Sequence, residues 1–112
     1  MKKIRVVMCP ADRAPYLTFI SNTLENMQRI VGGYIEAATM ASDAVVICNE
    51  EGRLLCMPEN RSLPVSGFVG DCFICGKDGE EFGDLSVKTA HDWLKAAKVK
   101  WMKQKGEEDN GV

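Results

Sequence analysis

Residues 44–57, which read AVVICNEEGRLLCM, set the expected fold. The run 44–48 is short, apolar and rich in β-branched side chains, which is typical of a buried strand. The asparagine and the glycine at the two ends of 49–52 match a type I turn closed by a left-handed residue, a common hairpin connection. We therefore expect a β-hairpin whose returning strand covers 53–57 and ends at Pro58, because proline cannot donate to a ladder.

Toward the N-terminus the hydrophobic period changes twice. Residues 15–31 place apolar side chains at three- and four-residue steps, which predicts an amphipathic helix that ends at Gly32 and Gly33. Residues 34–36 then read as a short strand. Residues 2–9 place Lys3, Arg5 and Val7 on one face and Ile4, Val6 and Met8 on the other, which predicts a first strand with one solvated side.

Toward the C-terminus a polar loop at 58–66 precedes a further strand at about 68–75. A glycine-rich acidic turn covers 76–84, and Ser86 is a suitable N-cap for a final helix that continues to about residue 104. The expected order is β-α-β-β-β-β-α. Short connections between consecutive strands predict an α+β fold: a mainly antiparallel sheet of about five strands with two packed helices.

Length and composition predict one domain. The chain has 112 residues, 46% apolar and 27% charged, which suits a single domain at 1–105 followed by a disordered acidic tail at 106–112. No stretch approaches the ~20 apolar residues that span a bilayer, so we expect no membrane insertion. Five cysteines in apolar contexts are typical of free thiols in a reducing compartment, and we expect a cytoplasmic protein.

Three segments together resemble a known family. They are 31–36 (VGGYIE), 49–54 (NEEGRL) continuing to 58–61 (PENR), and 70–76 (GDCFICG) followed by Asp78-Gly79 and Leu85-Ser86. The chain resembles domain-of-unknown-function family 3846 over roughly residues 1–95. The resemblance implies a short protein encoded by bacteria, phages or conjugative elements, and it implies no activity and no catalytic residues. Typical members have an apolar residue where Cys72 and Cys75 stand, and a shorter, less basic final helix.

The cysteines do not predict a metal or redox site. Cys72 and Cys75 are three apart on an expected strand, so they point to opposite faces, roughly 10 Å apart by the strand rise. Cys48 and Cys56 flank the expected hairpin turn without being cross-strand partners, which disfavours a disulfide. We expect packing thiols, no metal and no cofactor.

Other catalytic patterns are weak. His91 is the only histidine, and it lies off the inner stripe of its helix, as expected for a surface residue. No nucleophile elbow accompanies it, which disfavours acyl transfer. The acidic turn at 78–84 lacks the spacing of a calcium loop, and no phosphate-loop lysine follows its glycines. A cysteine-dependent enzyme that uses Cys9 or Cys56 with His91 is a further hypothesis, ranked below the two hypotheses described in the next paragraphs.

The loop between two prolines holds the candidate ligand residues. Asn60 and Arg61 lie there, and loops often carry binding residues. Arg61 could clamp a carboxylate or phosphate through its bidentate fork, or it could cap strand carbonyls instead. With Asn49 in the hairpin turn, these residues support the second hypothesis, a binding domain for a small anionic ligand or nucleotide.

The final helix carries the candidate partner-binding residues. Trp93 and Trp101 are eight apart on one face, and residues 86–105 hold six lysines against the single Asp92. Both tryptophans could pack on the sheet while lysine stems extend to water. Alternatively, Trp101 could anchor a partner, with lysines steering an acidic surface. We therefore select four residues as candidates for partner binding: Trp93, Lys98, Lys100 and Trp101.

The leading hypothesis combines these observations. We expect an interaction or regulatory protein without catalytic activity, such as an accessory factor of a phage or mobile element that binds a host protein. The net charge of −2 and the pI of about 5.4 make nucleic-acid binding unlikely.

Overall fold

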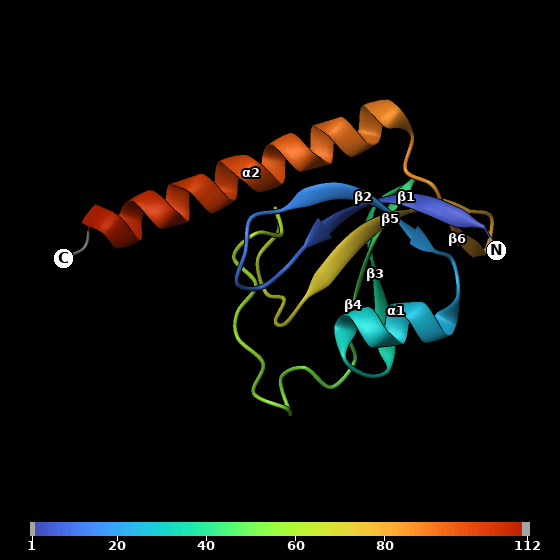
Figure 1. Ribbon diagram of the computed structural model, residues 1–112, viewed down its shortest axis with the longest axis horizontal. Helices are drawn as coiled ribbons and strands as arrows, with labels where there is room; N and C mark the ends of the chain where they lie inside the picture. The colour runs from blue at the N-terminus through green and yellow to red at the C-terminus, as the bar shows by residue number, and fades with distance from the viewer. Residues whose placement is uncertain (1, 111–112) are drawn as a thin grey trace.

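The computed structural model describes residues 2–110 and consists of one antiparallel sheet with two helices (Figure 1). Its element order is β-β-α-β-β-β-β-α, which confirms the α+β class and the antiparallel sheet. The strands are β1 (Lys3–Cys9), β2 (Tyr16–Ser21), β3 (Ile35–Ala41), β4 (Ala44–Asn49), β5 (Cys72–Asp78) and β6 (Glu81–Gly83). The helices are α1 (Leu24–Val31) and α2 (Val87–Asn110).

The strands do not follow chain order across the sheet. Their spatial order is β2-β1-β5-β4-β3, and β6 pairs with the C-terminal end of β5. The central strand is therefore β5, which the chain reaches only after the long segment between residues 50 and 71. The first five residues of β5 are all buried, as expected for a strand with a neighbour on each side and a helix on each face.

Each face of the sheet has its own core. One cluster packs against α2 and the loop before β5, and the other packs against α1. Cys72 belongs to the α2-side cluster, whereas Cys75 belongs to the α1-side cluster. The prediction that these two thiols point away from each other is therefore confirmed, since positions three apart on a strand face opposite sides.

The N-terminal half of the predicted helix 15–31 is wrong. Residues 16–21 form β2, whose register places Ile20 opposite Ile4 and Leu17 opposite Val7. A three-residue apolar spacing fits one face of a helix, but it equally puts two side chains on opposite faces of a strand. Pairing with β1 decides between them, because Leu17 packs on the α2 side and Ile20 on the α1 side.

Only the second half of that segment is helical. Thr23 is the N-cap of α1, its side chain accepting from the backbone N–H of Asn26, and Gly32 ends the helix with φ 82°. This left-handed conformation favours glycine, as the sequence predicted. Met27 and Val31 are the buried residues of this short helix, which packs against β4 and β3.

The predicted returning strand 53–57 is also wrong. The backbone N–H of Gly52 donates to the carbonyl of Asn49 at 3.3 Å, as in the predicted turn, but the chain then continues in further turns. The two neighbours of β4 are β3 and β5, so no edge of β4 is open to a returning strand. Leu54 and Leu55 consequently remain exposed.

Two further boundaries differ from the prediction. The strand expected at 68–75 begins at Cys72 and continues to Asp78, and the acidic turn is the tip of the β5–β6 hairpin, with Gly79 at φ 64°. At Gly76 an added Cβ would lie 2.0 Å from the backbone oxygen of Asp84. Glycine is therefore required there by the close approach of the segment that leads to α2.

Helix α2 lies across the opposite face from α1 and continues past the sheet (Figure 1). Ser86 caps it, accepting from the backbone N–H of Thr89 at 3.1 Å, as predicted. Ala90 and Ala97 are fully buried and let the helix lie close to the strands, while Trp93 and Leu94 pack beside them. Among the described residues, no helix is long and apolar enough to cross a membrane.

The acidic tail stays a prediction. Helix α2 continues through residue 110, so residues 106–110 are helical rather than a segment after the helix. Residues 111–112 lie outside the described part of the chain.

Candidate functional site

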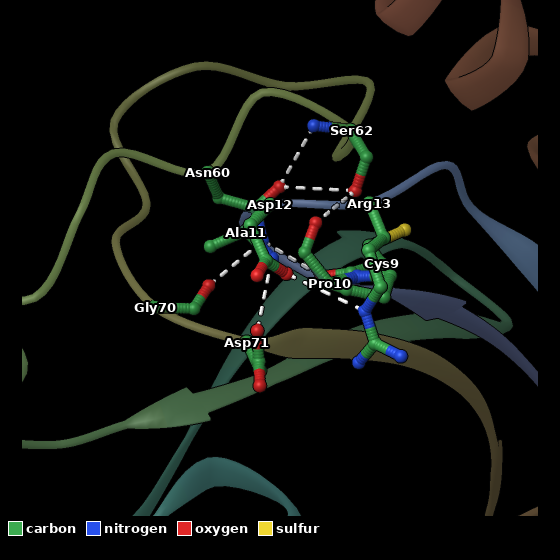
Figure 2. Close-up of polar contacts among 9 residues, drawn as sticks. All are labelled: Cys9, Pro10, Ala11, Asp12, Arg13, Asn60, Ser62, Gly70 and Asp71. Atoms are coloured by element: carbon green, nitrogen blue, oxygen red, sulfur yellow. Dashed lines mark hydrogen bonds and ion pairs between the residues drawn. The ribbon is translucent and has the colours of Figure 1, made fainter.

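Three segments meet at the carboxyl end of β1, and Asn60 joins them (Figure 2). Its Nδ2 donates to the carbonyl oxygens of Cys9 and Gly70, both at 2.8 Å. Its Oδ1 accepts from the backbone N–H groups of Ser62 at 3.0 Å and Leu63 at 2.8 Å. Asn60 is 2% exposed, so its whole amide is used inside the protein.

Two further side chains secure the same junction. The Ser62 hydroxyl donates to the carbonyl of Pro10 at 2.8 Å, and a carboxylate oxygen of Asp71 accepts from the backbone N–H of Ala11 at 2.9 Å. Figure 2 shows these contacts holding the segment after β1 against the loop and the start of β5. We call Asn60, Ser62 and Asp71 with their partners the polar hub. It fixes the backbone from which the neighbouring side chains project.

A cavity of about 370 Å³ lies beside the polar hub, under the last turns of α2. We call it the α2 cavity. Its volume falls in the range of pockets that hold small molecules. Its walls come from the segment after β1, from the loop that holds Asn60, and from α2. The lining residues are Ala11, Asp12, Pro58, Glu59, Arg61, Trp101, Gln104 and Lys105.

The lining combines an aromatic ring, a polar amide and charges of both signs. Trp101 and Gln104 are half-buried, and the Oε1 atom of Gln104 is buried without a hydrogen-bond partner among the described residues. A buried acceptor left unpaired is costly to the folded state. Arg61 and Lys105 supply cations, and Asp12 pairs with Arg13 at 3.4 Å.

The structure brings two of the predicted residues together and separates the others. Arg61 and Trp101 line the same cavity, although one was selected as a ligand residue and the other as a partner residue. Asn60 lies in the polar hub behind it. Asn49 lines a different hollow of about 180 Å³ beside Cys48, and its amide donates to the carbonyl of Val31 at 3.1 Å.

The remaining residues selected on α2 differ in exposure. Trp93 packs against the α2-side core, Lys98 is exposed, and the Nζ atom of Lys100 donates to the carbonyl of Val65 at 3.3 Å.

The sequence analysis missed Gln104 and Lys105. They follow Trp101 by three and four residues, which places all three on one side of a helix, so helical periodicity from Trp101 could have found them.

The thiols form an arrangement that the sequence analysis also missed. Cys9 and Cys72 are directly opposite each other on β1 and β5, and Cys48 belongs to the same α2-side cluster. Burial raises the pKa of Cys9 and of Cys75 to about 12, and burial also raises the pKa of Cys72. These thiols stay protonated at neutral pH, which makes them poor nucleophiles.

The other two residues of the cysteine-dependent enzyme hypothesis, Cys56 and His91, are exposed rather than buried. Cys56 is exposed in the turns after β4, and His91 is exposed on α2. Within residues 2–110, the structure has no group of three or more His, Cys, Asp or Glu side chains that could hold a metal ion.

Comparisons with known proteins identify a family but no activity. No curated protein and no solved structure matches the chain. A family model described as "Domain of unknown function (DUF3846)" matches residues 2–98. That range includes the sheet, the polar hub and Arg61, whereas Trp101, Gln104 and Lys105 lie beyond it. Because the match covers most of the 112 residues, the chain belongs to the DUF3846 family.

Proposed function

We propose that this protein is a binding domain without catalytic activity, and that it takes a small anionic ligand in the α2 cavity. The observation that carries the proposal is the meeting of Arg61 and Trp101 at one cavity from segments forty residues apart. An arginine fork can hold a carboxylate or phosphate through two hydrogen bonds, and an aromatic wall provides apolar contact area.

The charges of the lining favour an anion. Asp12 is paired with Arg13, so that pair contributes no net charge. Arg61 and Lys105 are the cations among the described lining residues, and Glu59 is the other acidic residue there. Lysines at exposed positions of α2 add to this positive potential, because the helix has no acidic residue between Asp92 and Glu107.

The side-chain types that line the cavity support binding rather than acyl transfer by a hydroxyl or thiol. Among the described residues that line it, the cavity has no serine, threonine, cysteine or histidine. Two thiols, Cys9 and Cys56, are each two residues from a lining residue. Cys9 is fully buried and its pKa is raised by burial, whereas Cys56 is exposed and is not itself a lining residue.

A ligand-detected NMR screen of small carboxylates and phosphates tests the proposal. We expect saturation-transfer signals from at least one anion, and we expect Arg61→Ala to weaken binding more than tenfold. Arg53→Ala is the matched control, because Arg53 is also exposed but lines the separate hollow that holds Asn49. Equal binding by the wild type and Arg61→Ala, or no anion binding at all, would reject the proposal.

A second candidate function is binding of an acidic host protein, as expected for an accessory factor of a phage or mobile element. The observation that favours it is the outer face of α2. Lys98 and Lys103 are exposed there beside two exposed apolar side chains, Val99 and Met102. Lysines around an apolar anchor suit an acidic surface with a hydrophobic centre.

In-cell photocrosslinking distinguishes this second candidate from the first. A photoreactive residue at Met102 should capture one acidic protein reproducibly, and Lys98→Glu with Lys103→Glu should abolish the capture. The control position is Leu54, which is 81% exposed in the turns after β4. Capture of the same proteins from both positions would argue against a specific surface on α2.

A further inference from the structure

We infer that β2 is a dimerisation edge, which pairs antiparallel with β2 of a second copy of this chain and places Thr18 opposite Thr18 on the two-fold axis. In the strand order β2-β1-β5-β4-β3, β2 and β3 are the outer strands. An outer strand presents a row of unpaired N–H and C=O groups that another strand can bind. The edge is separate from the α2 cavity, since no β2 residue is among the described residues that line it.

The hydrogen bonds of β1 determine which backbone groups of β2 point outward. In an antiparallel ladder the N–H and C=O of one residue point to the same side, and the side alternates along the strand. The N–H of Arg5 donates to Oδ1 of Asp84, and its C=O accepts from the N–H of Leu85, so both groups point away from β2. Phe19 is opposite Arg5 in the register. Phe19 therefore points its own N–H and C=O outward, as does Leu17, two residues earlier.

A second contact gives the same alternation. The N–H of Asn22 donates to the C=O of Lys2 at 2.9 Å, which makes the even-numbered residues of β1 and β2 the hydrogen-bonded pairs. Among the described residues, no hydrogen bond reaches the outward backbone groups of Leu17 or Phe19. These two residues therefore offer two donors and two acceptors along one open edge.

The outward groups favour one register for a two-fold symmetric pair. When Leu17 lies opposite Phe19 of the second copy, the two residues exchange both N–H···O hydrogen bonds, and the symmetry repeats the pair. Thr18 then lies opposite Thr18 of the second copy. These hydrogen bonds use only backbone groups that are free in the single chain.

The two neighbouring symmetric registers are less favourable. Placing Phe19 opposite itself brings Ser21 opposite Leu17. The Ser21 carbonyl already accepts from the N–H of Thr23 at 2.9 Å and from a side-chain amide of α1 at 3.0 Å, so it is not free. Placing Leu17 opposite itself brings Pro15 opposite Phe19, and proline has no N–H to donate.

The side chains of β2 suit a second copy as the occupant. Residues 16–21 carry no charge, so two copies meet there without repulsion. Phe19 is 50% exposed and Tyr16 is 44% exposed, and they lie on opposite faces of the sheet. In the favoured register Phe19 lies across from Leu17, and Tyr16 lies across from Ile20. Cross-strand pairs of an aromatic and an aliphatic side chain stabilise a sheet, so pairing would cover both exposed rings.

The other outer strand lacks these features. β3 carries the charged residue Glu36, and its register against β4 shifts between Thr39 and Ala41. A bulge bends a strand and interrupts its regular row of hydrogen-bonding groups, and a charge at an edge opposes pairing with a like edge. β3 is therefore protected from edge-to-edge association in two ways that β2 is not.

Sedimentation equilibrium of the full chain over a range of concentrations tests the dimer. We expect the mass to rise from 12.4 kDa toward twice that value at micromolar concentrations. Thr18→Lys should weaken association at least tenfold, because two lysines would then lie directly opposite each other on the axis. Thr39→Lys is the matched control, since Thr39 is an exposed threonine of β3, and it should leave association unchanged.

Mixing two charge variants checks the register. Thr18→Lys and Thr18→Glu should each be monomeric at concentrations where the wild type is a dimer. Their equimolar mixture should form a heterodimer, because opposite charges then meet on the axis. Circular dichroism shows whether each variant is folded, and mixing would not restore association to a chain that had lost its fold.

A cross-link gives a readout that does not depend on charge. An antiparallel pair without hydrogen bonds brings its Cα atoms to about 4.5 Å, which is within the range of a disulfide. Thr18→Cys should therefore form a disulfide-linked dimer under mild oxidation, whereas Thr39→Cys should not. Both are made with Cys56→Asn, which removes the exposed native thiol.

Several results would overturn the β2 dimer. A mass of 12.4 kDa at every concentration would do so. A dimer that survives Thr18→Lys, or that Thr39→Lys disrupts equally, would show that another surface joins the copies. Failure of the mixed charge variants to associate would reject the axis at Thr18. Anion binding enters none of these measurements, so they leave the function proposed for the α2 cavity unaffected.

Discussion

The polar hub and the wall of the α2 cavity are adjacent in sequence but differ in what they do for the protein. Asn60 is 2% exposed and its amide makes four hydrogen bonds to backbone groups, whereas Arg61 is exposed and lines the cavity. One residue builds the loop and the next is presented by it. Polar residues in the same motif can therefore have opposite importance for folding and for binding, and substitutions should separate the two.

The largest effect is expected at Asn60. Replacement by alanine removes both carbonyl contacts and both N–H contacts, and the buried partners lose their hydrogen bonds. Asn60→Ala should lower the free energy of unfolding by roughly 3–5 kcal/mol, because each unpaired buried group costs about 1–3 kcal/mol. Urea denaturation followed by circular dichroism measures it. Arg61→Ala should change stability by less than about 1 kcal/mol. Equal effects at both positions would break the comparison.

The second effect is a loss of stability at alkaline pH that depends on the buried thiol of Cys9. The pKa of Cys9 is raised by burial from its ordinary value of 9.0 to about 12, so the folded state keeps its proton where the unfolded state has lost it. The stabilising contribution is complete below pH 9 and is lost as the pH rises from 9 toward 12. The slope is about 1.4 kcal/mol per pH unit for one thiol.

Denaturation curves at several alkaline pH values check the size and sign of this effect. Cys9→Ala should have a shallower loss of stability with pH than the wild type. Cys56→Asn is the control, since Cys56 is exposed and asparagine tolerates its φ of 55°. A Cys9→Ala slope equal to that of the wild type would contradict the prediction.

A smaller effect is expected at Ser62, the second side chain of the hub. Ser62→Ala removes the hydrogen bond to the carbonyl of Pro10 and should lower the free energy of unfolding by about 1 kcal/mol. Because Ser62 also contacts the Oδ1 of Asn60, a double-mutant cycle with Asn60→Ala should give non-additive effects. Additivity within experimental error would mean that the two side chains act independently.

The smallest effect on stability is expected in the cavity wall. Gln104→Met removes a buried oxygen without a partner and keeps the volume of the side chain, so stability should stay constant or rise by up to about 1 kcal/mol. The thermal midpoint measures it. If the variant unfolds more readily than the wild type, Gln104 stabilises the fold. The contrast between a stabilising polar hub and a cavity wall that does not contribute to stability would then fail for α2.

The sequence predicts the local features of this fold well. The α+β class, the buried strand after residue 43, the glycine that ends α1 and the cap of α2 follow from side-chain period and turn chemistry. The opposite orientation of Cys72 and Cys75 follows from strand geometry alone. The two wrong elements, residues 16–21 and 53–57, depend on which strands pair. Strand pairing is a long-range property that residue period within one segment does not contain.

The same limit applies to the candidate site. Arg61 and Trp101 were selected for different reasons, because nothing in the sequence indicates that α2 crosses above the loop after Pro58. The roles of Asn49 and Asn60 were equally hidden. An asparagine in a turn can bind a ligand or bind the backbone, and the choice depends on which carbonyls come within reach after folding.

The close packing of α2 at Ala90 and Ala97 has a mechanical consequence. The cavity residues lie beyond this attachment, at the far end of a stiff rod, so a small tilt at the attachment becomes a larger displacement at Lys105. Eight residues of helix span about 12 Å, and a tilt of about 10° moves their far end by roughly 2 Å. A ligand bound in the α2 cavity would therefore fix the tilt of α2. A partner bound to the outer face of α2 would respond to this change in tilt.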